Sequence, residues 1–390
     1  MWVLIVIAII IIFFLIYNHQ SNSKTPELFK YPIRKSDLKL FWNGKDLFNQ
    51  LFEDIRKAEE FVCISFFIVR DDRFGDEFLT LLKEKADSGV PVYLLLDRIG
   101  SRSLKGRKDE LRQAGIHLTF SNRINLMKPI ASMNKRNHRK LTVIDGEIAY
   151  IGGFNVADEY VNESPKFSLW RDYHLRLTGE VVEDAQNLFT LDWEFSSKYP
   201  IKLTQKEHPP GTVKCQLVPT AQGSLEENMI NLISQAKQSI CIGSPYFIPS
   251  NKVFNLLLDK ANQGVQITIL YPHQSDHPLV KEASIPYLKK MQDVGANVQL
   301  FTNGFYHAKV IIIDDHIADV GTANFDRRSI FLSDELNVLI HNPVFIRTIY
   351  SIYSVDLKDS IPLYDQWMNT PNRLVMFFKK QVAYAFRGLL

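Results

Sequence analysis

A short pattern of histidine, lysine, aspartate and asparagine occurs twice in the sequence. Its members are His138, Lys140, Asp145 and Asn155 in the first copy, and His307, Lys309, Asp314 and Asn324 in the second. The spacing from His to Asn is 17 residues in both copies. A histidine supplies a nucleophile or a proton that titrates near neutral pH, and a lysine supplies a positive charge. Together they suit chemistry at an anionic, oxygen-rich group such as a phosphate.

Apolar runs at 141–144 and 310–313 predict the strands that carry the two His-Lys pairs. Because residues i and i+2 of a strand point to one face, each His is expected to share a face with its Lys. Strands and helices alternate along the rest of the chain, which favours an α/β fold with a mixed, largely parallel sheet flanked by helices. The same order occurs twice and predicts two similar lobes, residues 38–208 and 212–360. Packing about a pseudo-twofold axis would bring both His-Lys pairs to one cleft.

Composition limits the classes of partner. The chain has 390 residues, 46% hydrophobic and 23% charged, which is enough for two globular domains. The net charge of +3 is too small to indicate a polyanion partner, so no nucleic acid is expected. Cys63, Cys215 and Cys241 show no CxxC spacing and are predicted to be reduced core residues. His273 and His277 stand four residues apart, but their polar surroundings favour a loop over a metal site.

The first residues of the chain favour a membrane anchor. Residues 1–17 are uncharged and almost wholly apolar. As a helix they would span about 25 Å at ~1.5 Å per residue, close to the ~30 Å hydrocarbon core. A cleaved signal peptide would need a basic first region and a small-residue cleavage site, and neither is present. Residues 18–37 are polar and predict a tether. Basic residues after the span place the catalytic body in the cytoplasm, so a single-pass protein of the cell membrane is expected.

The last segment, residues 361–390, has a pattern of its own. Bulky apolar residues alternate with Lys and Arg over residues 372–390, which predicts a basic amphipathic helix. Such a helix could lie on an anionic membrane surface or pack on the second lobe. The sequence leaves both interpretations open.

The duplicated pattern resembles the phospholipase D superfamily, over essentially the whole chain after the anchor. Finer signatures are similar to bacterial cardiolipin synthases, namely residues 244–249 (Ser-Pro-Tyr-Phe-Ile-Pro), 170–172 (Trp-Arg-Asp) and 321–329 (Gly-Thr-Ala-Asn-Phe-Asp-Arg-Arg-Ser). The resemblance implies two phospholipase D-like lobes with the active site at their interface. It also implies a phosphatidyltransferase that joins two phosphatidylglycerol molecules and releases glycerol. The alternative is a phosphodiesterase of the same superfamily that hydrolyses phospholipid or nucleic acid.

The resemblance further implies a ping-pong mechanism that needs no cofactor and no metal. One His attacks phosphorus and the other serves as acid and then base. By resemblance His138 is the nucleophile and His307 the acid/base, although the residues alone do not order them. The other implied roles are oxygen binding by Lys140, Lys309, Asn155 and Asn324, orientation of His307 by Asp172 and of His138 by Glu335, and bracing of local turns by Asp145 and Asp314.

Overall fold

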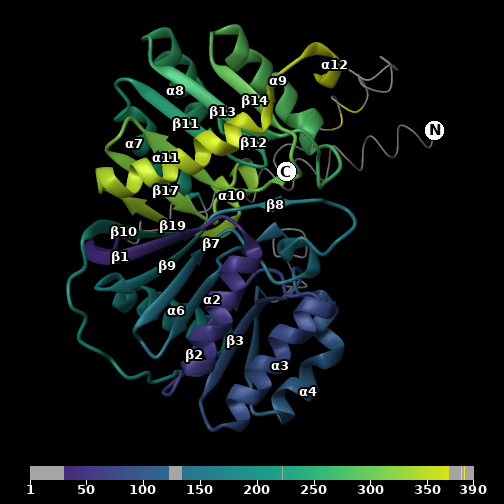
Figure 1. Ribbon diagram of the computed structural model, residues 1–390, viewed down its shortest axis with the longest axis vertical. Helices are drawn as coiled ribbons and strands as arrows, with labels where there is room; N and C mark the ends of the chain where they lie inside the picture. The colour runs from purple at the N-terminus through teal and green to yellow at the C-terminus, as the bar shows by residue number, and fades with distance from the viewer. Residues whose placement is uncertain (1–29, 123–133, 222, 369–378, 380–381, 383–390) are drawn as a thin grey trace.

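The computed structural model describes residues 30–122, 134–221, 223–368, 379 and 382. These residues form an α/β fold in which helices pack against a mixed sheet of 16 strands (Figure 1). The elements of the first half are β1 (Ile33–Phe41), α2 (Gly44–Lys57), β2 (Val62–Phe66), α3 (Arg73–Asp87), β3 (Val92–Asp97), α4 (Lys108–Gln113), β4 (His117–Ser121), β5 (Arg136–Asn137), β6 (Leu141–Ile144), β7 (Ile148–Gly152), β8 (Trp170–Arg171), β9 (His174–Gly179) and α6 (Val181–Ser197), with 3-10 turns at Arg102–Arg107 and Asp158–Val161.

The second half repeats much of this order. Its elements are β10 (Val213–Thr220), α7 (Ser224–Ser234), β11 (Ser239–Gly243), β12 (Phe247–Ile248), α8 (Asn251–Asn262), β13 (Gln266–Pro272), α9 (Val280–Asp293), β14 (Asn297–Phe301), β15 (Phe305–Tyr306), β16 (Val310–Ile313), β17 (Ile317–Gly321), β18 (Phe325–Asp326), α10 (Arg327–Phe331), β19 (Ser333–Ile340), α11 (Pro343–Lys358), β20 (Ser360–Pro362) and α12 (Asp365–Met368).

The order of strands in the sheet is mirrored about one central pair. Strands β1 and β10 are antiparallel neighbours, with Arg34 opposite Cys215. Outward from β1 the order is β9, β7, β6, β2, β3 and β4, and outward from β10 it is β19, β17, β16, β11, β13 and β14. The first half of the chain therefore lies on one side of the central pair and the second half on the other (Figure 1).

The prediction of a largely parallel sheet is wrong. Each half has one parallel block of three strands, β2-β3-β4 in the first half and β11-β13-β14 in the second. All neighbouring strands between these two blocks, including the central pair β1 and β10, are antiparallel. The reason is local, because β6 and β16 return at once as β7 and β17 instead of crossing over through a helix. Asp145 and Asp314 begin these turns with φ of 52° and 51°, a conformation that Asp tolerates.

The strands predicted at 141–144 and 310–313 are confirmed as β6 and β16. The His-Lys pairs themselves lie just before these strands, in residues that belong to no helix or strand. Strand β1 begins at Ile33, so residues 33–37 belong to the sheet and not to the tether. This strand looks like a linker in sequence because it is highly charged. In the fold, its residue Arg34 forms an ion pair with Asp184 at 2.7 Å.

Three large apolar clusters stabilise the sheet. One cluster packs α2 and α3 on the first half, and another packs α7, α8 and α9 on the second half. The third is continuous across both halves and includes residues of β9, β19, α6 and α11. Cys63, Cys215 and Cys241 are free and buried, as predicted. The shared cluster holds the two halves as one packed unit, so groups at their junction have fixed relative positions.

The predicted anchor, residues 1–17, and nearly all of the predicted helix at 372–390 lie outside the described residues. Within the described ranges, no helix combines the length and the apolar character that crossing a membrane requires.

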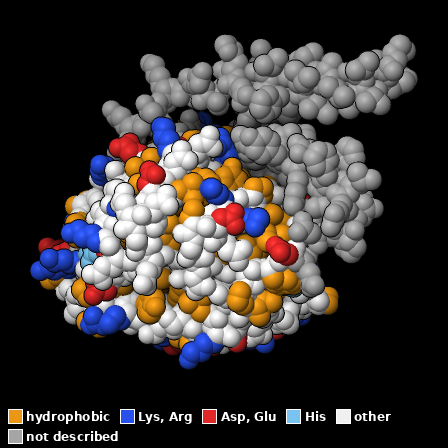
Figure 2. Space-filling view, turned by 90° about the horizontal axis from the view of Figure 1, so that it is seen from above, with side chains coloured by type: hydrophobic (Ala, Val, Ile, Leu, Met, Phe, Trp, Pro, Cys, Tyr) orange, Lys and Arg blue, Asp and Glu red, His pale blue; other side chains and the backbone are white. Residues whose placement is uncertain are grey.

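Figure 2 shows the molecule from above, where Lys and Arg side chains are interspersed with acidic and apolar ones.

Candidate active site

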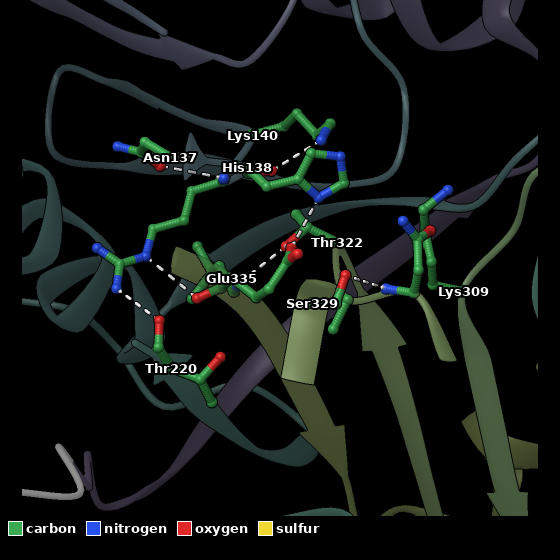
Figure 3. A network of polar contacts seen from close by, with 12 residues as sticks. Asn137, His138, Lys140, Thr220, Lys309, Thr322, Ser329 and Glu335 are labelled. Atoms are coloured by element: carbon green, nitrogen blue, oxygen red, sulfur yellow. Dashed lines mark hydrogen bonds and ion pairs between the residues drawn. The ribbon is translucent and has the colours of Figure 1, made fainter. Parts of the chain in front are cut away.

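The first histidine of the pattern lies beside a carboxylate from the second half. Strand β5, directly before His138, pairs in parallel with the start of β19. The backbone N–H of His138 donates to the carbonyl oxygen of Asp334 at 2.9 Å. The next residue is Glu335, and Nδ1 of His138 lies 2.8 Å from its carboxylate (Figure 3). The hydroxyl of Thr322 donates to the same carboxylate oxygen at 2.6 Å and accepts the backbone N–H of Leu336 at 2.8 Å.

The second histidine has the reciprocal arrangement. Strand β15, directly before His307, pairs with β8, and the backbone N–H of His307 donates to Arg171 O at 2.7 Å. Asp172 follows, and its Oδ2 lies 2.5 Å from Nδ1 of His307. The backbone N–H of Tyr173 donates to the other carboxylate oxygen at 2.8 Å. A Cβ added at Gly153 would meet that oxygen at 1.9 Å, so only glycine leaves room for Asp172.

A difference between the two motif copies now has a structural cause. Thr322 stands in the second copy where Gly153 stands in the first. Thr322 adds a donor to Glu335, whereas Gly153 makes space for Asp172. The role of Thr322 was missed from the sequence, and this Gly-to-Thr difference was the signal for it. Two short parallel bridges thus place each imidazole beside a carboxylate from the opposite half.

The two lysines of the pattern lie next to the histidines. Lys140 is buried and its Nζ donates to His138 O at 2.7 Å (Figure 3). Lys309 is also buried, and its Nζ lies 2.6 Å from Nδ1 of His307 and 3.5 Å from Asp172. The charge of Lys309 also acts on His138 in the other half. Both His-Lys pairs therefore belong to one electrostatic site.

Both histidines line one cavity of about 520 Å³. Asn155 and Asn324 line it too. The side chain of Asn155 accepts the backbone N–H of Ile68 at 3.1 Å, whereas Oδ1 of Asn324 has no hydrogen-bond partner among the described residues. The wall also includes Phe67, Arg70, Arg136, Glu159, Lys166, Trp170, Tyr246, Asp276, Arg328 and Ser333. The structure thus brings together every residue that the sequence analysis placed in catalysis or in oxygen binding.

Burial sets the protonation of the imidazoles. It lowers the pKa of His307 to about 4, helped by the charge of Lys309 and opposed by Asp172. Burial also lowers the pKa of His138, against the effect of Glu335. Burial alone would raise the pKa of the two carboxyls, but the adjacent cationic groups hold both below their ordinary values. Each ionised carboxylate then accepts a hydrogen bond from the Nδ1–H of a neutral imidazole, which leaves the lone pair on Nε2.

The pKa values of the two lysines are lowered toward neutral pH. Burial lowers the pKa of Lys140 to about 7 and that of Lys309 to about 8, although Glu335 and Asp172 both oppose the shift. A lysine is charged below its pKa, so the free site loses positive charge as the pH rises through this range.

We therefore expect kcat/KM for an anionic phosphodiester to fall as the pH rises above about 7 to 8, because kcat/KM reports groups of the free enzyme. Initial rates on vesicles between about pH 6 and about pH 10 measure this effect. The expected slope is negative on the alkaline side. If kcat/KM stayed constant up to the highest pH measured, the role of the two lysines in binding the phosphodiester would be contradicted.

Asp145 and Asp314 lie away from the cavity wall. The carboxylate of Asp314 accepts backbone N–H groups from Lys237, Gln238 and Ser239 at 3.1, 2.9 and 2.7 Å. The carboxylate of Asp145 accepts those of Glu59, Glu60 and Phe61 at 2.8, 2.8 and 2.9 Å. Each Asp thus ties the turn after its motif strand to the start of the neighbouring strand.

We expect Asp314→Ala to lower the free energy of unfolding by about 3 kcal/mol, because three backbone donors lose a charged acceptor. The positive φ of 51° adds strain for alanine. Chemical denaturation measures the change. Asp315→Ala is the matched control, since Asp315 is adjacent and exposed. An equal effect of the two substitutions would contradict the bracing role.

Sequence reasoning missed Arg139, which lies between His138 and Lys140 in the first motif. Its guanidinium donates to the carbonyl oxygens of Glu335 and Thr220 at 3.1 Å each and to Asp192 at 2.5 Å. It therefore fixes the first motif against the second half of the chain. The signal was its position, because a residue between His138 and Lys140 is expected to point away from the face that those two share.

Aromatic rings pack on both imidazoles. The ring of Trp170 lies 4.9 Å from that of His307, and the ring of Phe67 lies 4.9 Å from that of His138. Both aromatic residues also line the cavity. They restrict the rotation of the imidazoles and reduce the access of water to them.

Comparisons with known proteins place this site in a family. A family model described as "Cardiolipin synthase, PLD-like domain" matches residues 51–190 and 229–356. The chain belongs to the cardiolipin synthase family. Within that family, the minor cardiolipin synthase ClsB of Bacillus subtilis (strain 168) is 42% identical over 334 residues, which are 84% of this chain and 83% of that protein. The major cardiolipin synthase ClsA of the same organism is 37% identical over 340 residues, 84% of this chain and 70% of that protein.

A solved structure extends the comparison of folds. The crystal structure of phosphatidylserine synthase from Haemophilus influenzae Rd KW20 has a TM-score of 0.76 and 14% sequence identity, and the match covers 95% of this chain and 99% of that one. At this identity the likeness concerns the fold alone. The fold of this member of the cardiolipin synthase family thus also occurs in that protein.

Proposed function

We propose that the protein is a cardiolipin synthase, which transfers the phosphatidyl group of one phosphatidylglycerol to a hydroxyl of another and releases glycerol. Membership of the family and the names of the relatives support this activity. The observation that carries the proposal is geometric. Two imidazoles, each hydrogen-bonded to a carboxylate from the opposite half, line one cavity, and a buried lysine contacts each of the two histidines.

In the first step Nε2 of His138 attacks phosphorus, and the bond from phosphorus to the glycerol oxygen breaks. The products are a phosphatidyl-histidine and glycerol, whose oxygen takes a proton from His307. The low pKa of His307 in the free site reflects burial and the charge of Lys309. A bound anionic phosphodiester offsets that charge and raises the pKa, so substrate binding itself protonates the acid.

In the second step the neutral His307 takes the proton of the hydroxyl of a second phosphatidylglycerol. The resulting oxygen attacks phosphorus, the bond from phosphorus to Nε2 of His138 breaks, and cardiolipin leaves. Lys140, Lys309, Asn155 and Asn324 stabilise the charge on the non-bridging oxygens in both steps. Water in place of the lipid hydroxyl would give phosphatidic acid, and the aromatic residues beside the imidazoles help to exclude it.

The proposal includes two catalytic lobes, residues 38–208 and 212–360, with the site at their pseudo-twofold interface. The mirrored strand order and the reciprocal His-carboxylate pairs support this division. It also includes attachment to the cell membrane through residues 1–17, with the catalytic body in the cytoplasm and lipid as the partner. The uncharged, apolar composition of residues 1–17 supports that part.

Purified full-length protein and vesicles of labelled phosphatidylglycerol test the reaction. We expect cardiolipin and glycerol in equal amounts. Phosphatidic acid as the sole lipid product would show a phospholipase instead, and cleavage of DNA with no lipid product would show a nuclease.

We also expect EDTA to leave the rate unchanged. The lysines supply the positive charge at phosphorus, and no group of three or more potential metal ligands occurs in the part of the chain that the structure describes. The same vesicle assay with and without EDTA measures this. A loss of activity that added metal restores would refute lysine as the source of that charge.

A further inference from the structure

A carboxylate that the mechanism does not use lies on the cavity wall. Asp276 belongs to the loop between β13 and α9, and it lines the cavity together with Tyr246 and Trp170. Its side chain is 10% exposed. A nearly buried carboxylate beside a site for an anionic phosphate is unexpected, because the two charges repel each other.

The two oxygens of Asp276 differ in their contacts. Oδ2 accepts a hydrogen bond from the hydroxyl of Tyr246 at 2.7 Å. The ring Nε2 of His277, an exposed side chain, lies 3.5 Å from the same oxygen. Oδ1 is buried and has no hydrogen-bond partner among the described residues. Buried carboxylate oxygens in proteins are almost always hydrogen-bonded, so this one lacks its usual donor on a residue that lines the cavity.

Asp276 is on the His307 side of the cavity. Its charge acts on His307 and on Lys309 and favours the protonated form of each. The carbonyl oxygen of Asp276 accepts a hydrogen bond from Nζ of Lys166 at 3.4 Å, which ties the loop to the first half of the chain. The carboxylate therefore faces the place where the proposed mechanism needs an alcohol to leave and another to enter.

We propose that Asp276 binds the hydroxyl next to the reacting oxygen of a glycerol headgroup, and so selects a vicinal diol as the leaving and entering alcohol. This inference rests on the proposed function. An ionised carboxylate only accepts hydrogen bonds, so it binds a hydroxyl and repels a phosphate. The lipid phosphate then lies over Lys140 and Lys309, and the polyol end of the headgroup extends toward Asp276. One subsite serves both steps, because the same imidazole protonates one alcohol and deprotonates the next.

Two small alcohols isolate this contact. Propane-1,2-diol and propan-1-ol both offer a primary hydroxyl, but only the diol has a neighbouring one. Full-length protein is incubated with phosphatidylglycerol vesicles and both alcohols at equal concentration. Mass spectrometry then gives the ratio of phosphatidylpropanediol to phosphatidylpropanol. We expect wild type to favour the diol by about 10-fold or more, because a site built to bind a hydroxyl rejects the analogue without it.

We expect Asp276→Ala to bring this ratio to about 1 by lowering transfer to the diol more than transfer to propan-1-ol. Asp276→Asn keeps the size of the side chain and leaves an amide oxygen, which is a weaker acceptor. Its product ratio is therefore expected to lie between that of wild type and that of Asp276→Ala. The matched control is Glu159→Gln. Glu159 is also a carboxylate of the cavity wall, but it already forms an ion pair with Arg70 at 3.0 Å, so the ratio is expected to stay at the wild-type value.

Two results would overturn the inference. One is a wild-type protein with no preference for the diol. The other is an equal loss of both products in the Asp276 variants, which would indicate a structural role. The proposed function is judged separately, by whether wild type forms cardiolipin from phosphatidylglycerol. A diol preference without cardiolipin would refute that function and keep the subsite.

Discussion

His138→Ala is expected to abolish cardiolipin formation and to lower kcat/KM by about 10⁴-fold or more, because in the proposed mechanism this side chain forms the covalent bond to phosphorus. His307→Ala is expected to cause a similar loss with phosphatidylglycerol, whose glycerol must be protonated as it leaves. The vesicle assay measures both. His316→Ala is the control, since this side chain is 47% exposed in the turn after β16. Full activity of His138→Ala or of His307→Ala would contradict the mechanism.

The two histidine variants also separate nucleophile from acid/base. A phosphatidyl ester of nitrophenol has a leaving group that needs no proton. With this substrate His307→Ala should still release nitrophenol in a burst and accumulate a phosphatidyl group on His138. His138→Ala should release none. The reverse pattern would exchange the two roles and leave the reaction class unchanged.

Asp172→Asn is expected to lower kcat by about 10²- to 10⁴-fold while the protein stays folded. The amide can donate to Nδ1 of His307, which moves the imidazole proton to Nε2 and removes the lone pair from the cavity. The substitution also removes a negative charge 3.5 Å from Lys309, so the pKa of that lysine falls further. Glu335→Gln should act in the same way on His138. Steady-state rates together with thermal unfolding measure the two effects separately.

Asp54→Asn is the matched control for these substitutions. Asp54 is also a buried carboxylate, but it pairs with Arg176 at 2.7 Å and is not on the cavity wall. We expect it to lower stability and to leave kcat of the folded protein unchanged. If Asp172→Asn and Asp54→Asn lowered kcat equally, the carboxylate of Asp172 would have no special role in orienting the imidazole.

Local patterns were sufficient for part of the fold. The apolar runs at 141–144 and 310–313 are strands, and the repeated order of helices and strands reappears as a mirrored sheet. These features depend on neighbours within a few residues, which periodicity reports. The direction of the central strands was predicted wrongly, because it depends on the tight turns at Asp145 and Asp314. Strand β1 was read in part as a tether, because the ion-pair partner of Arg34 lies 150 residues away.

The sequence by itself determined the chemistry that this protein can perform, since the types and spacing of His, Lys and Asn in two copies are enough to indicate attack on a phosphate. Only the tertiary structure decided how these groups work together. The contact between His138 and Glu335 spans 197 residues and depends on β5 lying beside β19. The lowered pKa values of the lysines arise from burial, and the free oxygen of Asp276 arises from the packing of a loop. The burial of a group and the electrostatic field that acts on it depend on all residues near it in space. Most of those residues are far away in the sequence, so a local sequence pattern does not reveal them.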